Sequence, residues 1–136
     1  MSIEASAAKY LLRDMHPAAR EFYRRLAEEG QLATTRCERC AQTRFPPLER
    51  CPICGGQTTW LELPREGRLY AFTTQETALR FRAPAVLALA EVGEVVVPGI
   101  ASEPYAELSI GQRVRVEPMP EPDTGLTLLE FASAGD

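Results

Sequence analysis

The chain has 136 residues, 45% of them hydrophobic and 25% charged, which is enough for one globular core and a small additional module. No apolar run reaches the roughly 18 residues that a membrane-spanning helix needs, and the first residues do not resemble a secretion signal, so we expect a cytoplasmic protein without membrane contact. A net charge of −4 disfavours nucleic-acid binding, which depends on many Lys and Arg contacts with phosphate.

The charge is unevenly distributed along the chain. Residues 1–60 contain nine basic and seven acidic residues, whereas residues 61–136 contain six basic and twelve acidic residues. An anionic ligand is therefore expected near the first half or at its junction with the second half. A solvated surface without any ligand would show the same pattern, so this alternative stays open.

The first part of the chain is predicted to be helical. A short segment around residues 10–12 precedes a second helix from Pro17 to Gly30, because proline is favoured in the first turn of a helix and glycine just after its last turn. Phe22 and Leu26 are four residues apart and share a face. This amphipathic helix has no partner within its own segment, so it should pack on the rest of the chain or on another protein.

Four cysteines follow the helix as two Cys-x2-Cys pairs separated by ten residues: Cys37, Cys40, Cys51 and Cys54. Two such turns can place four thiolates tetrahedrally around one ion at about 2.3 Å. Gly55 and Gly56 follow the second pair, where the backbone must turn back towards the sulfurs without a Cβ atom in the way. Two disulfides are the alternative, which a reducing compartment opposes, and a redox pair normally occurs alone. Zinc is the expected ion, although iron in a rubredoxin-like site would use the same ligands. Because four protein ligands leave no open position, the ion is predicted to be structural.

After the cysteines, the pattern changes to short β-strands with Gly and Pro between them. Five strands are predicted, at Arg68–Thr74, Pro84–Val92, Glu94–Ile100, Arg113–Glu117 and Leu126–Phe131. The fourth of these alternates strictly, which predicts Val114 and Val116 inward and the two arginines outward. This number of short strands indicates a small barrel or sandwich. The predicted fold class is therefore mainly β with an N-terminal helix. We divide the chain into a helical segment (1–32), a ribbon (33–60), a barrel (61–132) and a loose tail (133–136).

Side chains for covalent catalysis are scarce. The four cysteines are assigned to the metal, and the single histidine, His16, is interpreted as an exposed residue between two helical segments. A Ser-His-Asp triad needs a better-placed histidine, and no phosphate-binding glycine motif is present. The chain is therefore expected to have no catalytic residues of its own.

Residues 20–131 resemble a known family, the rubredoxin-like zinc-ribbon plus OB-fold proteins associated with acyl-CoA metabolism. The resemblance rests on the helix FYRRLAEEGQL, the ribbon RCERCAQTRFPPLERCPICGG, and the barrel segments FRAPAVLALAEVGE and LSIGQRVRVE. It implies a five-stranded OB-fold barrel, one structural zinc ion and a CoA thioester as a shared ligand. The resemblance also implies a non-catalytic partner of a thiolase-superfamily enzyme, or of a hydratase or aldolase acting on CoA thioesters. Among thiolase partners, the small subunit of benzoylsuccinyl-CoA thiolase is similar in size and layout. The expected assembly is a hetero-oligomer with a thiolase-like catalytic subunit.

Two clusters are predicted to contact CoA. Arg80, Phe81 and Arg82 precede the central strand, and Arg44 and Phe45 lie in the ribbon. Guanidinium groups suit phosphates, and a flat aromatic ring suits adenine. For each cluster, a solvated arginine beside a core aromatic ring is the alternative interpretation.

Other functions remain open at this point. The partner could be an acyl-CoA aldolase, lyase or hydratase in place of a thiolase, or the chain could carry acyl-CoA without any enzyme. A single-stranded nucleic-acid-binding OB-fold would need basic and exposed aromatic residues along its groove. The acidic second half of the chain disfavours that reading.

Overall fold

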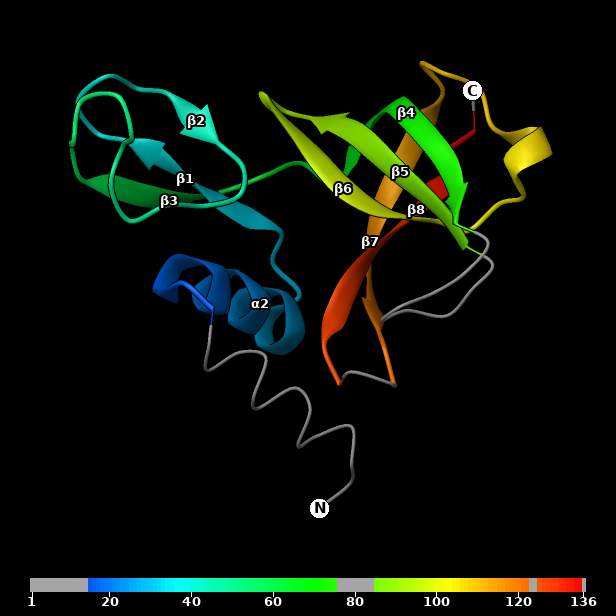
Figure 1. The fold of residues 1–136 in the computed structure, drawn as a ribbon, viewed down its shortest axis with the longest axis horizontal. Helices are drawn as coiled ribbons and strands as arrows, with labels where there is room; N and C mark the ends of the chain where they lie inside the picture. Colours follow the sequence, from blue (N-terminus) through cyan, green and yellow to red (C-terminus); the bar gives the residue numbers. More distant parts are fainter. Residues whose placement is uncertain (1–14, 76–84, 123–124, 136) are drawn as a thin grey trace.

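The computed structural model describes residues 15–75, 85–122 and 125–135. Helix α2 (Pro17–Glu29) leads into a three-stranded ribbon, which is followed by a closed five-stranded barrel. Ribbon and barrel lie side by side, and α2 packs below their junction in Figure 1. The predicted fold class, mainly β with an N-terminal helix and an OB-fold barrel, is confirmed. The predicted helical segment around residues 10–12 lies outside the described residues.

Helix α2 begins and ends where the sequence predicts. Pro17 occupies the first turn, and Gly30 ends the helix with a φ of 64°. Phe22 and Leu26 are buried against the barrel core, so the helix packs within its own chain. His16 is exposed, as interpreted from the sequence, but it also caps the helix, because its Nδ1 accepts a hydrogen bond from the Ala18 N–H at 3.2 Å.

The ribbon is an antiparallel sheet with β1 (Ala33–Cys37) between β2 (Thr43–Arg44) and β3 (Thr58–Glu62). Its two fully buried threonines are both hydrogen-bonded. The Thr34 hydroxyl donates to the Arg44 carbonyl, and the Leu48 N–H donates to the Thr35 hydroxyl at 2.9 Å. Pairing the buried hydroxyls avoids the cost of leaving polar groups without partners. The ribbon interior is thus partly polar.

The barrel consists of β4 (Glu66–Gln75), β5 (Ala85–Val92), β6 (Val95–Ala101), β7 (Arg113–Pro120) and β8 (Thr127–Ser133). Its strands pair in the order β4-β5-β6-β8-β7, and β7 pairs back to β4 to close the barrel. All pairs are antiparallel except β6 and β8, which pair in parallel at Ile100 and Ala101. A short 3-10 helix, Tyr105–Glu107, lies between β6 and β7.

Alternate strand residues fill the barrel. Val114 and Val116 are each only 1% exposed, and Arg113 forms an outward ion pair with Glu66 at 2.9 Å, as the alternation of β7 predicts. Eleven buried side chains of the barrel strands belong to this core: Leu69, Ala88, Ala90, Val92, Val95, Val97, Ala101, Val114, Val116, Leu129 and Phe131. A dry apolar interior of this kind can stabilise the barrel without a metal.

Strands β4, β6, β7 and β8 all run beyond their predicted bounds, and β7 and β8 extend furthest at their C-terminal ends. Strand β7 extends to Pro120 and not only to Glu117, and β8 extends to Ser133 and not only to Phe131. The reason is that their antiparallel ladder is continuous, from Pro120 opposite Thr127 to Val114 opposite Ser133. Long-range pairing, which the local sequence pattern does not show, therefore carries both strands beyond their predicted ends.

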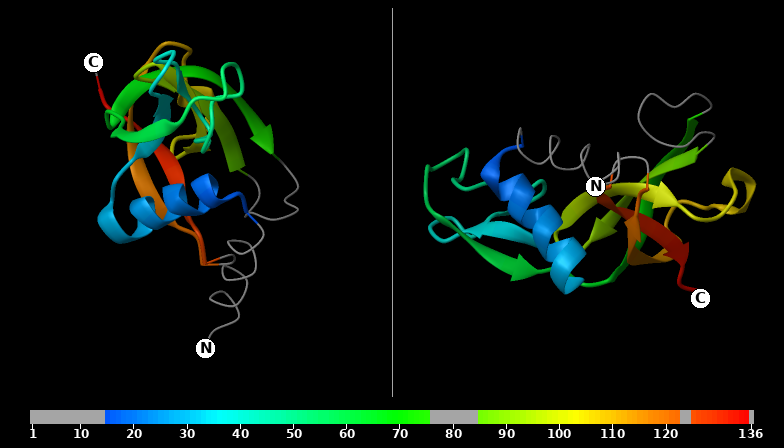
Figure 2. Two further views of the ribbon diagram at one scale, coloured as in Figure 1. Left: turned by 90° about the vertical axis from the view of Figure 1, so that its left-hand side faces the viewer. Right: turned by 90° about the horizontal axis from the view of Figure 1, so that it is seen from below.

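Arg65, which lies between β3 and β4, joins the end of α2 to the barrel. Its guanidinium donates to the Gly30 carbonyl at the end of α2 and, through Nε at 2.9 Å, to the Val116 carbonyl of β7. It also lies 3.6 Å from the carboxylate of Glu117. Figure 2 shows the resulting arrangement, in which α2 lies alongside both the ribbon and the barrel.

Candidate metal centre and apolar groove

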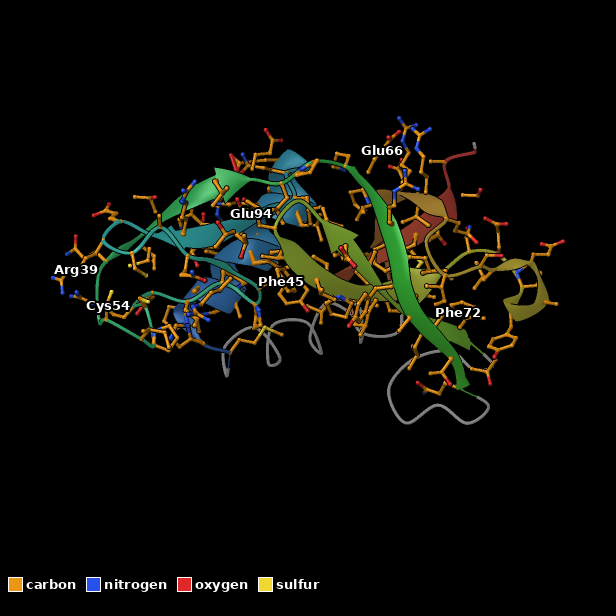
Figure 3. The ribbon with its side chains drawn as sticks, turned by 90° about the horizontal axis from the view of Figure 1, so that it is seen from above. Arg39, Phe45, Cys54, Glu66, Phe72 and Glu94 are labelled. Atoms are coloured by element: carbon orange, nitrogen blue, oxygen red, sulfur yellow. The ribbon has the colours of Figure 1, made fainter. Side chains whose placement is uncertain are left out.

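The four cysteines come together at the end of the ribbon remote from the barrel. Their Sγ atoms all lie within 4.8 Å of one another, and none forms a disulfide. The Cys37–Cys54 and Cys40–Cys51 sulfur pairs are separated by 3.5 Å and 3.6 Å. A tetrahedron with metal–sulfur bonds of about 2.3 Å has sulfur–sulfur edges of about 3.8 Å, so the arrangement fits one metal ion. Figure 3 shows Cys54 at this end, beside Arg39.

The two Cys-x2-Cys turns have the same backbone design. The Ala41 N–H donates to the Cys37 carbonyl at 3.0 Å, and the Gly55 N–H donates to the Cys51 carbonyl at 2.9 Å. Both closing residues are left-handed, with φ of 61° at Ala41 and 72° at Gly55. Glycine adopts this conformation without strain, whereas alanine does not. Sequence reasoning therefore identified the second turn but gave no signal for Ala41.

The cysteine sulfurs leave too little room for a side chain at position 56, where the sequence has glycine. A Cβ atom at this position would lie 3.0 Å from the Cys37 sulfur and 3.2 Å from the Cys54 sulfur. Contacts this short force the neighbouring atoms to move, and metal-bound sulfurs have little freedom to do so. The prediction that the glycines after Cys54 let the backbone turn towards the sulfurs is thus confirmed at Gly56.

Hydrogen bonds from backbone N–H groups favour the thiolate form of two of the cysteines. The N–H of Cys40 is the largest cause of the lowered pKa of the Cys37 thiol. The N–H groups of Cys54 and Ile53 lower the pKa of the Cys51 thiol to about 6. For Cys40, the N–H of Gln42 lowers the pKa, but the neighbouring sulfurs, that of Cys37 above all, outweigh it together with partial desolvation and raise the pKa to about 11. A bound cation removes this mutual repulsion, because it favours the thiolate at every position.

Arginines surround the centre. The Arg39 guanidinium donates to the Cys54 carbonyl at 3.3 Å and so links the two turns, while the Arg36 Nε donates to the Ala41 carbonyl at 3.1 Å. These positive charges partly offset the net charge of −2 on a zinc tetrathiolate. Four soft sulfur donors in a closed tetrahedron support a structural zinc ion at this site.

A second feature is a hollow of about 480 Å³ between α2, the ribbon and the barrel, which we call the α2–barrel groove. It is lined by Ala19, Phe22, Tyr23, Phe45, Pro46, Pro47, Leu87, Val96, Pro98, Gly99, Ile100, Leu128 and Leu129. Tyr23 is the only one of these residues whose side chain carries a polar atom, and burial raises the pKa of its phenol. The groove is thus an apolar concavity at the junction of two domains.

The groove exists because β6 and β8 diverge. In the described chain they pair only at Ile100 and Ala101, so residues 95–99 of β6 pair with β5 alone. Aromatic rings occupy part of the gap, and the Phe22 and Phe45 rings meet edge to face at 5.3 Å between their centroids. Figure 3 shows Phe45 between the ribbon and the barrel.

Only two of the predicted CoA-contact residues, Arg44 and Phe45, lie in the part of the chain that the structure describes. Phe45 lines the α2–barrel groove, whereas Arg44 lies in β2 and is not among the lining residues. The Arg44 Nε is buried and has no hydrogen-bond partner among the described residues. Arg80, Phe81 and Arg82 lie outside the described residues. Trp60, at the end of the ribbon that joins the barrel, packs against the core and carries the Arg25 guanidinium 4.6 Å above its ring.

A cysteine ribbon joined to a closed β-barrel defines the class of zinc-ribbon plus OB-fold proteins. Residues 24–59 match the rubredoxin-like zinc ribbon domain of ChsH2, and residues 60–117 match the C-terminal OB-fold domain of ChsH2. The chain therefore belongs to the ChsH2 family of zinc-ribbon and OB-fold proteins, and the resemblance found in the sequence is confirmed.

Two solved structures extend this comparison. One, described as the Ltp2-ChsH2(DUF35) aldolase, is 25% identical with a TM-score of 0.76 and covers 90% of this chain and 98% of the other. The second, a protein of unknown function of the DUF35 family from Sulfolobus solfataricus, is 12% identical with a TM-score of 0.64, covers 95% of each chain, and shows the shared fold alone. No curated protein matches the chain. Within the described residues, no helix has the length and apolar character to cross a membrane.

Proposed function

We propose that the chain is a non-catalytic, zinc-binding subunit of a cytoplasmic thiolase-type acyl-CoA enzyme complex. The proposal rests on the positions of the cysteine and histidine side chains. All four cysteines of the sequence lie in one closed metal centre, and its single histidine caps α2. Neither residue type is left to act as a nucleophile or a general base, which supports a partner as the source of the chemistry.

The zinc ion has a structural role in this proposal. Cys37, Cys40, Cys51 and Cys54 would fill all four positions of a tetrahedral ion and leave none for a substrate or water. When bound, the ion supplies folding energy and no Lewis-acid step. Its task is to hold the ribbon, and with it Phe45, in place against the barrel.

Arg44, Arg80 and Arg82, with Phe45 and Phe81, are the proposed contacts of the CoA part of the thioester. Guanidinium groups suit the phosphates, and the rings suit the adenine. The buried Arg44 Nε without a described partner supports an anionic ligand near β2. The excess of basic residues in the first half of the chain supports the same location.

The partner need not be a thiolase. The similar structure described as the Ltp2-ChsH2(DUF35) aldolase favours an acyl-CoA aldolase as the second candidate, and a hydratase is a further one. A nucleic-acid-binding role is disfavoured by the outer face of β5 and β6. That face exposes Leu89 and Val96, where a single-strand-binding barrel would place basic residues.

Co-expression tests the accessory role. The chain should co-purify with a thiolase-like protein encoded beside its gene and restore the activity that this protein lacks alone. Thiolysis of a 3-oxoacyl-CoA identifies a thiolase partner, and retro-aldol cleavage identifies an aldolase partner. If the catalytic protein is equally active and stable without this chain, the accessory role is wrong.

The CoA contacts need their own experiment in the reconstituted complex. Replacing Arg80 and Arg82 together by alanine should raise the KM for CoA without changing the fold. Replacing Arg113 and Arg115, which lie on the outer face of β7, is the matched control and should have little effect. An unchanged KM in the first variant would reject these residues as phosphate contacts.

A further inference from the structure

The lining of the α2–barrel groove is unlike a CoA-binding surface. The pantetheine arm of CoA carries amides and hydroxyl groups, and its nucleotide carries phosphates, all of which need hydrogen-bond partners when they are buried. The groove offers the Tyr23 hydroxyl as its only polar side-chain group. A hydrocarbon, by contrast, gains free energy by leaving water for such a surface.

The size and shape of the groove suit a small ligand. Its volume of about 480 Å³ falls within the ~300–1,000 Å³ range of small-molecule pockets, which often lie at domain junctions. Helix α2, the Phe45–Pro47 segment and the barrel strands line it. A stable protein interface would need a broader surface, with about 800 Å² buried on each partner.

The groove walls are held in place before any ligand arrives. Phe22 is buried and meets both Tyr23 and Phe45 edge to face, at 5.2 Å and 5.3 Å between ring centroids. The floor at Gly99 is packed from inside the barrel, since a Cβ there would lie 2.8 Å from the Phe131 ring. A rigid wall binds a ligand without an added ordering cost.

We infer that the α2–barrel groove binds the hydrocarbon part of an acyl group. That the hydrocarbon is the acyl part of a thioester substrate rests on the proposed function. The chain then contributes to acyl-group selection as well as to holding CoA, and Phe45 lies where the two parts of the substrate would meet.

Decanoate and pantetheine serve as probes of the full-length, zinc-loaded chain. Each is titrated into isotope-labelled protein below the critical micelle concentration, and the amide NMR signals are followed. Decanoate should shift the signals of Tyr23, Gly99 and Ile100 saturably, and pantetheine should leave them unchanged. Val96→Trp, which fills the groove, should weaken decanoate binding by about tenfold or more, or ~1.4 kcal/mol.

Leu89→Trp is the matched control. Leu89 is 37% exposed and Val96 is 39% exposed, both lie on the outer face of neighbouring strands, and only Val96 lines the groove. The control should bind decanoate with an affinity within about twofold of the original chain. The inference is overturned if the unsubstituted chain shows no saturable decanoate shifts, if Val96→Trp binds equally well, or if pantetheine moves the same signals.

The outcomes also separate this inference from the proposed function. A chain that restores its catalytic partner but binds no decanoate retains the accessory role and loses the acyl groove. A chain that binds decanoate in the groove but neither joins nor activates a catalytic subunit retains the groove and loses the accessory role.

Discussion

The ribbon and the barrel of this chain are stabilised by different interactions. The barrel closes its hydrogen-bond ladders and fills its interior with apolar side chains such as Leu69, Val97 and Phe131. The ribbon has three short strands, buried threonines and four sulfurs at its far end. A segment this small buries too little apolar surface to be stable alone, so its folding energy must come from the metal. One chain thus combines a self-sufficient domain with a metal-dependent one.

The largest effect should come from breaking the metal centre. Cys54→Ser removes one of four ligands, and structural zinc sites contribute on the order of 10 kcal/mol. The amide NMR signals of β1 and β3 should collapse towards random-coil positions, while those of the barrel interior stay dispersed. Zinc analysis should show the loss of the ion.

Ile53→Ser is the control for this experiment. Its side chain is 76% exposed in the same turn, one residue before Cys54, so the variant should keep its zinc and its ribbon signals. A Cys54→Ser variant with an intact ribbon would show that the ribbon does not depend on metal.

A substitution in the barrel core should weaken the barrel and leave the metal centre intact. Leu69 is 1% exposed, and Leu69→Ala should lower the free energy of unfolding of the barrel by about 2–5 kcal/mol. Urea denaturation measures the change, and the folded variant should still hold one zinc ion. Ile110→Ala, at a side chain that is 64% exposed, should change stability by less than about 0.5 kcal/mol. Equal effects of the two substitutions would contradict the position of the core.

A smaller effect compares the two cysteine turns with each other. Ala41 and Gly55 share a left-handed conformation, so Ala41→Gly should stabilise the ribbon by about 1 kcal/mol and Gly55→Ala should destabilise it by a similar amount. Competition with a zinc chelator at neutral pH measures both changes. A loss of zinc affinity in Ala41→Gly would mean that the two turns are not equivalent.

The smallest effect concerns α2, which links the two domains. Within α2, the hydrogen bond that the Glu21 carboxylate accepts from Arg24 lowers the pKa of Glu21 from 4.5 to about 2. The ionised carboxylate therefore stabilises the fold above pH 4.5, and this contribution is lost as the pH falls towards 2. Glu21→Gln should remove this acid-dependent loss. Because the pair is solvent-accessible, the change should stay below about 1 kcal/mol in acid-titrated thermal unfolding. Glu38→Gln, an exposed position outside α2, is the control, and an equal response there would reject the assignment.

Local signals predicted much of the fold. The spacing of Cys37 to Cys54 predicted the metal centre, and Pro17 and Gly30 marked the helix ends, because short-range sequence determines these features. The alternation of β7 correctly placed Val114 inside the barrel. Strand ends were less predictable, since the end of β7 depends on its pairing with β8.

Features assembled from distant parts of the chain could not be predicted. The α2–barrel groove draws on α2, the ribbon and three barrel strands, and no local pattern marks it. Arg65 resembles any surface arginine until its bonds to Gly30 and Val116 are seen. Ala41 gave no signal, because only its backbone conformation distinguishes it from other alanines.

Metal content and thiol reactivity of the purified native chain test the central claim most directly. Elemental analysis should give one zinc ion per chain, and all four cysteines should resist alkylation until the zinc is chelated. A metal-free native fold, or a cysteine that is freely alkylated and essential for turnover by the isolated chain, would contradict a structural metal centre in a non-catalytic subunit.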